Sequence, residues 1–268
     1  KAGSPANPPP VTETPPAPCT ASASWITAPN PPTEIGDGVP VDQETNCQFY
    51  QFSYQWFLSL VQPTAPSSSE RVFETFRVYQ PGQENQCQLP SVTGKANAAK
   101  ALFVRTAKTD SQDFDPVLPE EIAQATGQAL YDQKGNVVLY NVLYNPTECQ
   151  ATSAGFQPNT IEIKTSWRMM DSGDPNLSQY YVMNATIPSI SPNPLTLGMV
   201  GFHLVINTQK HPEFVWATFE HKDNAPDCTN PQPTPSEGWS FTSSACASCL
   251  ATQSVSQCAQ SMPQCDFN

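Results

Sequence analysis

The sequence predicts a mainly β (α+β) protein built on an antiparallel sheet, sandwich or barrel-like, with two short peripheral helices and disulfide-stapled tails. Segments of alternating apolar and polar residues recur through the second half of the chain, and clusters of Pro, Gly, Asn and Asp separate them. Such alternation is typical of strands with one buried face. Nine cysteines are spread from one end of the chain to the other, which indicates disulfide bonds.

Three parts are expected along the chain. Residues 1–41 form a Pro-rich extended arm, because runs such as Pro8-Pro9-Pro10 oppose helices and central strands. Residues 42–228 form a single mainly-β domain. Residues 229–268 are polar and Cys-rich, with too little apolar surface for a separate core, so we expect a tail packed on the domain.

Two helices are predicted. The first can be capped by Asp42 and ends before Pro63, and its aromatic residues at three- and four-residue spacing predict a face packed on the core. The second covers residues 119–128, with Pro119 in the first turn.

The strands begin with a hairpin over residues 129–144, turning at Gln133-Lys134-Gly135. Polar turn residues delimit the strands that follow, and an antiparallel meander is the natural connection between them. These further strands are expected at residues 161–169, 180–187, 199–207 and 213–222.

Composition limits the compartment and the partners. The net charge is -12, from 12 basic and 24 acidic residues, so nucleic acid is not an expected partner. The longest apolar run, residues 195–206, is too short for the roughly 20 residues that a bilayer requires, so membrane insertion is not expected. A low charged fraction and a start that resembles a processed end favour a secreted protein, extracellular or at the cell surface, with the periplasm as an alternative.

The cysteines could form disulfides or a metal site. Only Cys246 and Cys249 are closely spaced, no His lies near them, and Leu250 stands where covalent haem attachment requires His. We therefore predict disulfides, no metal and no cofactor, with the connectivity left open. Cys19 is the candidate for an interchain disulfide, because it stands furthest from the predicted core.

Four polar residues are candidates for a site on the sheet. In the predicted strands they fall on the less apolar faces, and if these faces coincide a base, an acid and two cations converge. A solvated sheet face with cross-strand ion pairs is the alternative, and we favour it. The catalytic candidates are His203, Glu220, Lys164 and Arg168.

A second candidate site lies near the end of the last predicted strand. A rigid strand often positions a functional loop at such a place. A metal site is disfavoured there, because adjacent strand residues such as Glu220 and His221 point to opposite faces. The binding candidates are Trp216, His221, Asp223 and Asn224.

The sequence contains no hydrolase, zinc-protease, phosphate-loop or calcium-loop signature. Its segments Trp56-Phe57-Leu58-Ser59-Leu60, Lys164-Thr165-Ser166-Trp167-Arg168 and Trp216-Ala217-Thr218-Phe219-Glu220-His221 resemble a family of uncharacterised secreted bacterial proteins. The resemblance covers roughly residues 45–228. It implies export and one domain, and it implies no reaction.

Two functional classes remain. The first, which we favour, is an extracellular structural or interaction protein, a subunit of an assembly held by its arm; the partner is then another copy or another extracellular protein. Prolines pre-extend the arm, which still requires a surface to order it, so we expect residues 1 to about 40 to dock largely on a partner, along a sheet edge. The alternative is a secreted enzyme or ligand-binding protein that uses the His/Glu/Lys cluster.

The cysteine distribution predicts about four disulfides and at most one free thiol in the native protein. Titration of thiols in denaturant without reductant measures this directly. Most cysteines reacting, or stoichiometric zinc protecting them, would contradict the disulfide prediction.

Overall fold

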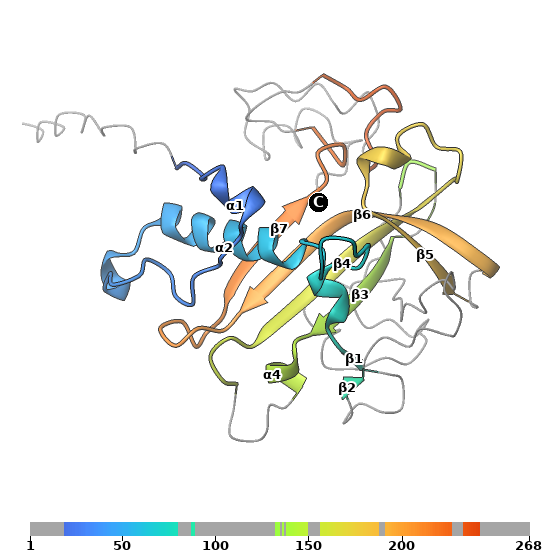
Figure 1. Ribbon diagram of the computed structural model, residues 1–268. Helices are drawn as coiled ribbons and strands as arrows, with labels where there is room; N and C mark the ends of the chain where they lie inside the picture. The colour runs from blue at the N-terminus through green and yellow to red at the C-terminus, as the bar shows by residue number, and fades with distance from the viewer. Residues whose placement is uncertain are drawn as a thin grey trace, which may run out of the picture.

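The five-stranded antiparallel sheet is open, with one long helix across one face (Figure 1). The predicted mainly β class is therefore confirmed, as an open sheet rather than a closed barrel. The structure is a computed structural model that describes residues 19–79, 87–88, 132–134, 136, 138–149, 156–187, 191–226 and 233–241. The predicted helix at residues 119–128 and residues 129–131, 135 and 137 of the predicted hairpin lie outside these residues.

One strand, β6 (Ser191–Ile206), pairs with three others. Strand β4 (Ile161–Met170) occupies one of its sides. On the other side, β5 (Val182–Ile187) pairs with its first half and β7 (Val215–Glu220) with its second half. Strand β3 (Leu139–Tyr144) completes the sheet beyond β4.

This order corrects the predicted meander. Strand β4 pairs with β6, although β5 follows it in the chain. Strand β6 has 16 residues. Its first half forms a hairpin with β5 and its second half pairs with β7 on the same side, so its other side pairs with β4.

A β-bulge in β6 keeps apolar side chains on one face. The register runs from Ser166 opposite Gly201 to Trp167 opposite Met199, so Val200 is the extra residue. The bulge shifts the alternation by one residue. Leu197 before it and Phe202 after it are therefore both buried in the core on the helix side.

Helix α2 (Asn46–Leu60) covers the end of the sheet near β7 (Figure 1). Its N-cap is Thr45, not the predicted Asp42. The backbone N–H of Gln48 donates to the Thr45 hydroxyl, and the backbone N–H of Thr45 donates to the side-chain oxygen of Gln48, which together form a capping box. The predicted aromatic face packs on the core, with the Phe57 ring stacked on Phe219 at 4.2 Å between centroids.

Among the described residues, no helix has the length and apolar character that a membrane span requires.

Shorter elements connect these parts of the fold. The short elements are α1 (Ser24–Thr27), η1 (Val41–Gln43), η2 (Val72–Thr75), β1 (Val78–Tyr79), β2 (Cys87–Gln88), α4 (Pro146–Cys149) and η3 (Leu177–Gln179).

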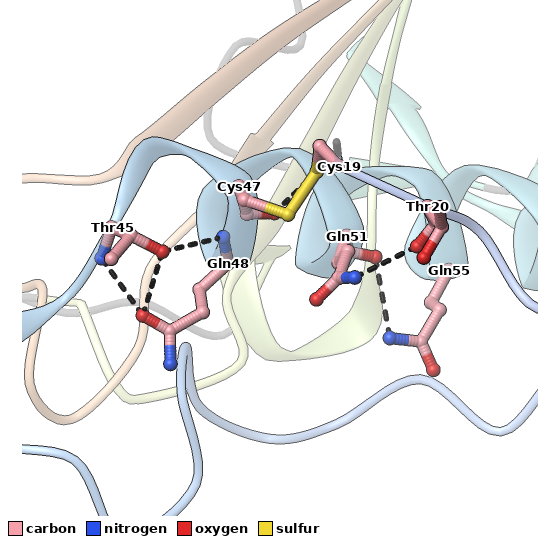
Figure 2. The surroundings of a disulfide bond; sticks show 7 residues. All are labelled: Cys19, Thr20, Thr45, Cys47, Gln48, Gln51 and Gln55. Atoms are coloured by element: carbon pink, nitrogen blue, oxygen red, sulfur yellow. Dashed lines mark hydrogen bonds between the residues drawn. A yellow bond between two sulfur atoms is a disulfide. The ribbon is translucent and has the colours of Figure 1, made fainter. Parts of the chain in front are cut away.

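The described part of the arm, residues 19–40, packs on its own chain. Ile35 is fully buried in the main core. Three arm carbonyls accept hydrogen bonds from side chains of α2 and of the residues just after it. Those bonds run from Gln51 to the Thr20 carbonyl at 2.8 Å (Figure 2), from Trp56 to Pro32 at 2.9 Å and from Gln62 to Ile26 at 3.3 Å.

Two expectations about the arm are thus corrected. Cys19 forms a disulfide with Cys47 of the same chain, on α2, so it is not an interchain bridge (Figure 2). Residues 19–40 contact their own domain, because Ile35 and the arm carbonyls find apolar and donor groups on it. Residues 1–18 lie outside the described chain. Cys149 is disulfide-bonded as well.

The described part of the tail, residues 233–241, also lies against the domain. The Ser240 amide donates to the Asp223 carbonyl, the Gln133 amide donates to the Ser240 carbonyl, and Trp239 is 3% exposed. The four tail cysteines that were expected to staple it lie outside the described residues.

The loop between β6 and β7 holds the residues that precede α2. Glu34 accepts from the Lys210 amide at 3.2 Å, and buried Glu44 lies 2.7 Å from the Nε2 of His211, whose Nδ1 lies 3.0 Å from Glu213. Burial, the largest single influence, lowers the pKa of His211. The hydrogen bonds and charges of Glu213 and Glu44 outweigh it, and the pKa is raised above 6.5.

A charged His211 therefore favours the folded chain. Its stabilisation is complete below the pKa of an unfolded histidine, 6.5, and is lost as pH rises through the raised folded pKa. We expect the free energy of unfolding of the wild type to fall over that interval, and His211→Gln to be less stable at pH 6 and to lack this fall. Urea unfolding across pH 5.5–8.5 measures both.

His221→Gln is the control for this experiment. Burial lowers the pKa of His221, so its contribution is lost as pH falls below 6.5 and the alkaline slope should persist in this variant. An alkaline slope that also persists in His211→Gln would show that another group causes it.

Candidate functional site

The sheet register shows where the polar candidates lie. Lys164 is directly opposite His203, and His203 is directly opposite Thr218, whose hydroxyl is 2.9 Å from its Nδ1. Glu220, opposite Gly201, lies one row further along the same face, two residues from Thr218. Three of the four catalytic candidates thus share one region of this face, and their catalytic role stays a prediction.

Arg168 also points to this face but is bound to a buried carboxylate. Its Nε lies 3.0 Å from the Asp132 carboxylate, whose side chain is fully buried, and its Nη1 donates to the Ser240 hydroxyl at 3.2 Å. Asp132 accepts two further hydrogen bonds from the amides of Lys134 and Asn136. No sequence pattern predicts this pair, because the two residues are 36 positions apart.

The binding candidates after β7 secure the strand end. The His221 ring stacks on Tyr180 at 3.9 Å, and Asp223 contacts the Lys222 ammonium group at 2.8 Å. Asn224 is buried and donates to the Val200 carbonyl at the β-bulge. These contacts join the end of β7 to β6 and to the η3 region, and a binding role for the three residues stays a prediction.

A polar pocket of about 260 Å³ lies beyond this strand end. Asp223 and Lys222 contribute to its wall, together with the tail residue Trp239. Within the described chain, no group of three or more His, Cys, Asp or Glu is placed to hold a metal ion.

Trp216, the remaining binding candidate, belongs to a different place. It is 62% exposed and lines a groove of about 360 Å³, which we call the β7 groove. Strand β7 contributes residues 215–219, α2 contributes one wall and the arm contributes the other. The aromatic side chains that line the groove are Trp25, Phe49, Tyr50, Tyr54, Trp216 and Phe219.

The β7 groove runs along an unpaired strand edge. The His221 amide donates to Val200 of β6, and in an antiparallel pair the direction of the backbone groups alternates. The N–H and C=O groups of Trp216, Thr218 and Glu220 therefore point away from β6. No described strand pairs with β7 on that side, and all three residues are exposed.

The arm wall of the groove is fixed covalently. The disulfide ties Cys19 to α2, and the hydrogen bond from Gln51 fixes Thr20 one residue later (Figure 2). Tyr50 and Tyr54 lie one helical turn apart on α2, and Tyr50 is 66% exposed. The groove is thus a preformed channel with a strand edge between aromatic walls.

Sequence reasoning found Trp216 but missed Trp25, Tyr50 and Tyr54. The four-residue spacing of the two tyrosines was a usable signal, because it places them on one side of the predicted helix. Trp25 had no signal, since only the docking of the arm brings it to β7.

The Arg168–Asp132 pair gives a direct test of whether Arg168 is structural. Asp132→Ala should lower the free energy of unfolding by about 3–5 kcal/mol, because it leaves a mostly buried guanidinium without its counter-ion. Denaturant unfolding measures the loss, with exposed Asp171→Ala as the control. Equal stability of Asp132→Ala and wild type would free Arg168 for another role.

Comparison with known proteins gives no family. No family model, curated protein or solved structure matches the chain. The resemblance to uncharacterised secreted proteins stays a prediction, and functional inference rests on the geometry of the chain itself.

Proposed function

We propose that this protein is a secreted interaction protein, a subunit of an extracellular or cell-surface assembly that binds an extended polypeptide segment in the β7 groove. The observation that carries the proposal is the unpaired edge of β7 between exposed aromatic side chains. Its outward groups, on Trp216, Thr218 and Glu220, can form a ladder with an added strand.

The groove has the parts that strand addition requires. Main-chain groups provide affinity for any extended segment, and the aromatic walls provide apolar surface and selectivity. The disulfide and the arm hydrogen bonds hold the walls in place before binding, which reduces the entropy that binding must overcome. An exposed strand edge otherwise promotes aggregation, so a strand edge bordered by α2 and the arm is consistent with a specific partner.

Export is part of the proposal. The disulfide and the second bonded cysteine, Cys149, are typical of an oxidising compartment such as the extracellular space or the periplasm. A bacterial source follows from the sequence resemblance alone.

Strand addition can be tested at Thr218. Thr218→Pro removes one outward N–H without breaking the β6–β7 ladder, and Thr218→Val keeps that N–H while losing the same hydroxyl. We expect the wild type and Thr218→Val to self-associate as concentration rises, and Thr218→Pro to do so about tenfold more weakly. Sedimentation equilibrium measures association, and circular dichroism checks the fold.

The aromatic wall is tested in the same assay. Trp216→Ala should weaken association by at least about tenfold, whereas Phe156→Ala, which removes another exposed aromatic ring outside the groove, should not. Association of Thr218→Pro as strong as that of Thr218→Val would contradict the proposed function.

A further inference from the structure

We infer that the occupant of the β7 groove is residues 11–14 of a second copy of this chain, added as a strand to β7. This inference rests on the proposed function and names its partner. The segment comprises Val11, Thr12, Glu13 and Thr14, and Pro8-Pro9-Pro10 and Pro15-Pro16 flank it.

Residues 11–14 are the longest proline-free stretch between the first and last prolines of residues 1–18. Seven of those 18 residues are proline, and a proline cannot donate to a strand ladder. Val and Thr favour extended, pleated backbone. Four such residues offer two N–H and two C=O groups on one side, against the three of each that β7 presents.

The flanking prolines match the walls of the groove. Proline-rich segments adopt an extended helix that docks on aromatic side chains, and it loses little conformational entropy on binding. Trp25, Tyr50 and Trp216 border the groove. Tyr50 and Trp216 each have more than half of their surface exposed. The composition of the segment is therefore suited to both components of the groove, its strand edge and its aromatic rings.

The position of Cys19 favours a second copy over the same chain. Cys19 lies in the groove wall, and only Pro15-Pro16-Ala17-Pro18 separates it from residue 14. Three prolines in four residues favour extended backbone, at about 3 Å per residue. So short and proline-rich a spacer opposes the reversal by which residues 11–14 would return to the groove beside Cys19 of the same chain, whereas at full extension it spans about 12 Å and allows them to reach a neighbour.

Such binding joins two different surfaces. Each copy gives its segment to one neighbour and receives a segment from another, so the contact is heterologous and the product is a ring or an open filament. A variant without a working segment still has a groove, and a variant without a working groove still has a segment. Mixing the two therefore allows one contact, which gives a pair and no larger assembly.

The experiment uses these two full-length variants. In the inferred register the backbone N–H groups of Thr12 and Thr14 face β7. The segment variant, Thr12→Pro/Thr14→Pro, removes these two ladder donors, with Thr12→Val/Thr14→Val as its matched control. The groove variant is Thr218→Pro. We expect each proline variant alone to associate at least about tenfold more weakly than its valine control, and their equimolar mixture to form a 1:1 complex. Multi-angle light scattering after gel filtration measures the masses.

The outcomes separate the inference from the proposed function. If Thr218→Pro weakens association but Thr12→Pro/Thr14→Pro does not, the groove is a docking site and residues 11–14 are not its occupant. If Thr218→Pro has no effect, the proposed function itself fails. A monomeric wild type in which both proline variants expose Trp216 to fluorescence quenching would show binding within one chain and overturn the second-copy inference. A mixture that remains monomeric would overturn it too.

Discussion

The pairing of β6 with three strands sets the arrangement of the sheet and the position of its β7 edge. A 16-residue strand has backbone groups on both sides along its whole length, and each needs a partner when it is buried. Strand β4 supplies one side, while β5 and β7 share the other. The bulge at Val200 lies where these two strands meet, and it keeps the apolar face continuous across the junction.

Strand β7 pairs with the second half of β6 and with no other described strand, so it forms an edge of the sheet. Helix α2 crosses the sheet at this edge. The helix presents one aromatic face to Phe202 and Phe219 and leaves Tyr50 beside the strand. The arm then closes the far side, held by the disulfide at its start and by the β6–β7 loop near its end. The groove is therefore a product of the packing of three chain segments, none of which forms a site alone.

The two polar regions have different physical roles. The row of Lys164, His203 and Thr218 lies on an accessible face next to the groove, whereas Arg168 and Asp132 form an ion pair with very little contact with solvent. A buried guanidinium needs its counter-ion, so this pair fixes the position of the tail through Ser240. The same residue types on one sheet face thus divide into a structural ion pair and a row of residues that lie opposite one another on neighbouring strands.

Local patterns in the sequence were enough to predict the class of the fold and the position of most strands. Alternation along residues 161–169 and 199–207 reflects burial of one face, and this is a local property that needs no knowledge of the partner strand. The spacing of aromatic residues likewise located α2, although a capping box at Thr45 rather than Asp42 sets its start. The face shared by Lys164, His203 and Glu220 also followed from alternation, once the strands were adjacent.

The strand order, the partner of Cys19 and the groove depend instead on contacts between distant parts of the chain. Strand order depends on which hairpin leaves an edge free, and disulfide pairing depends on distance in space, neither of which is written in residue spacing. Trp25 and Trp216 are 191 positions apart in the chain and line one groove because the arm docks on α2. Long-range packing creates such sites, so a pattern that reports only local periodicity cannot contain them.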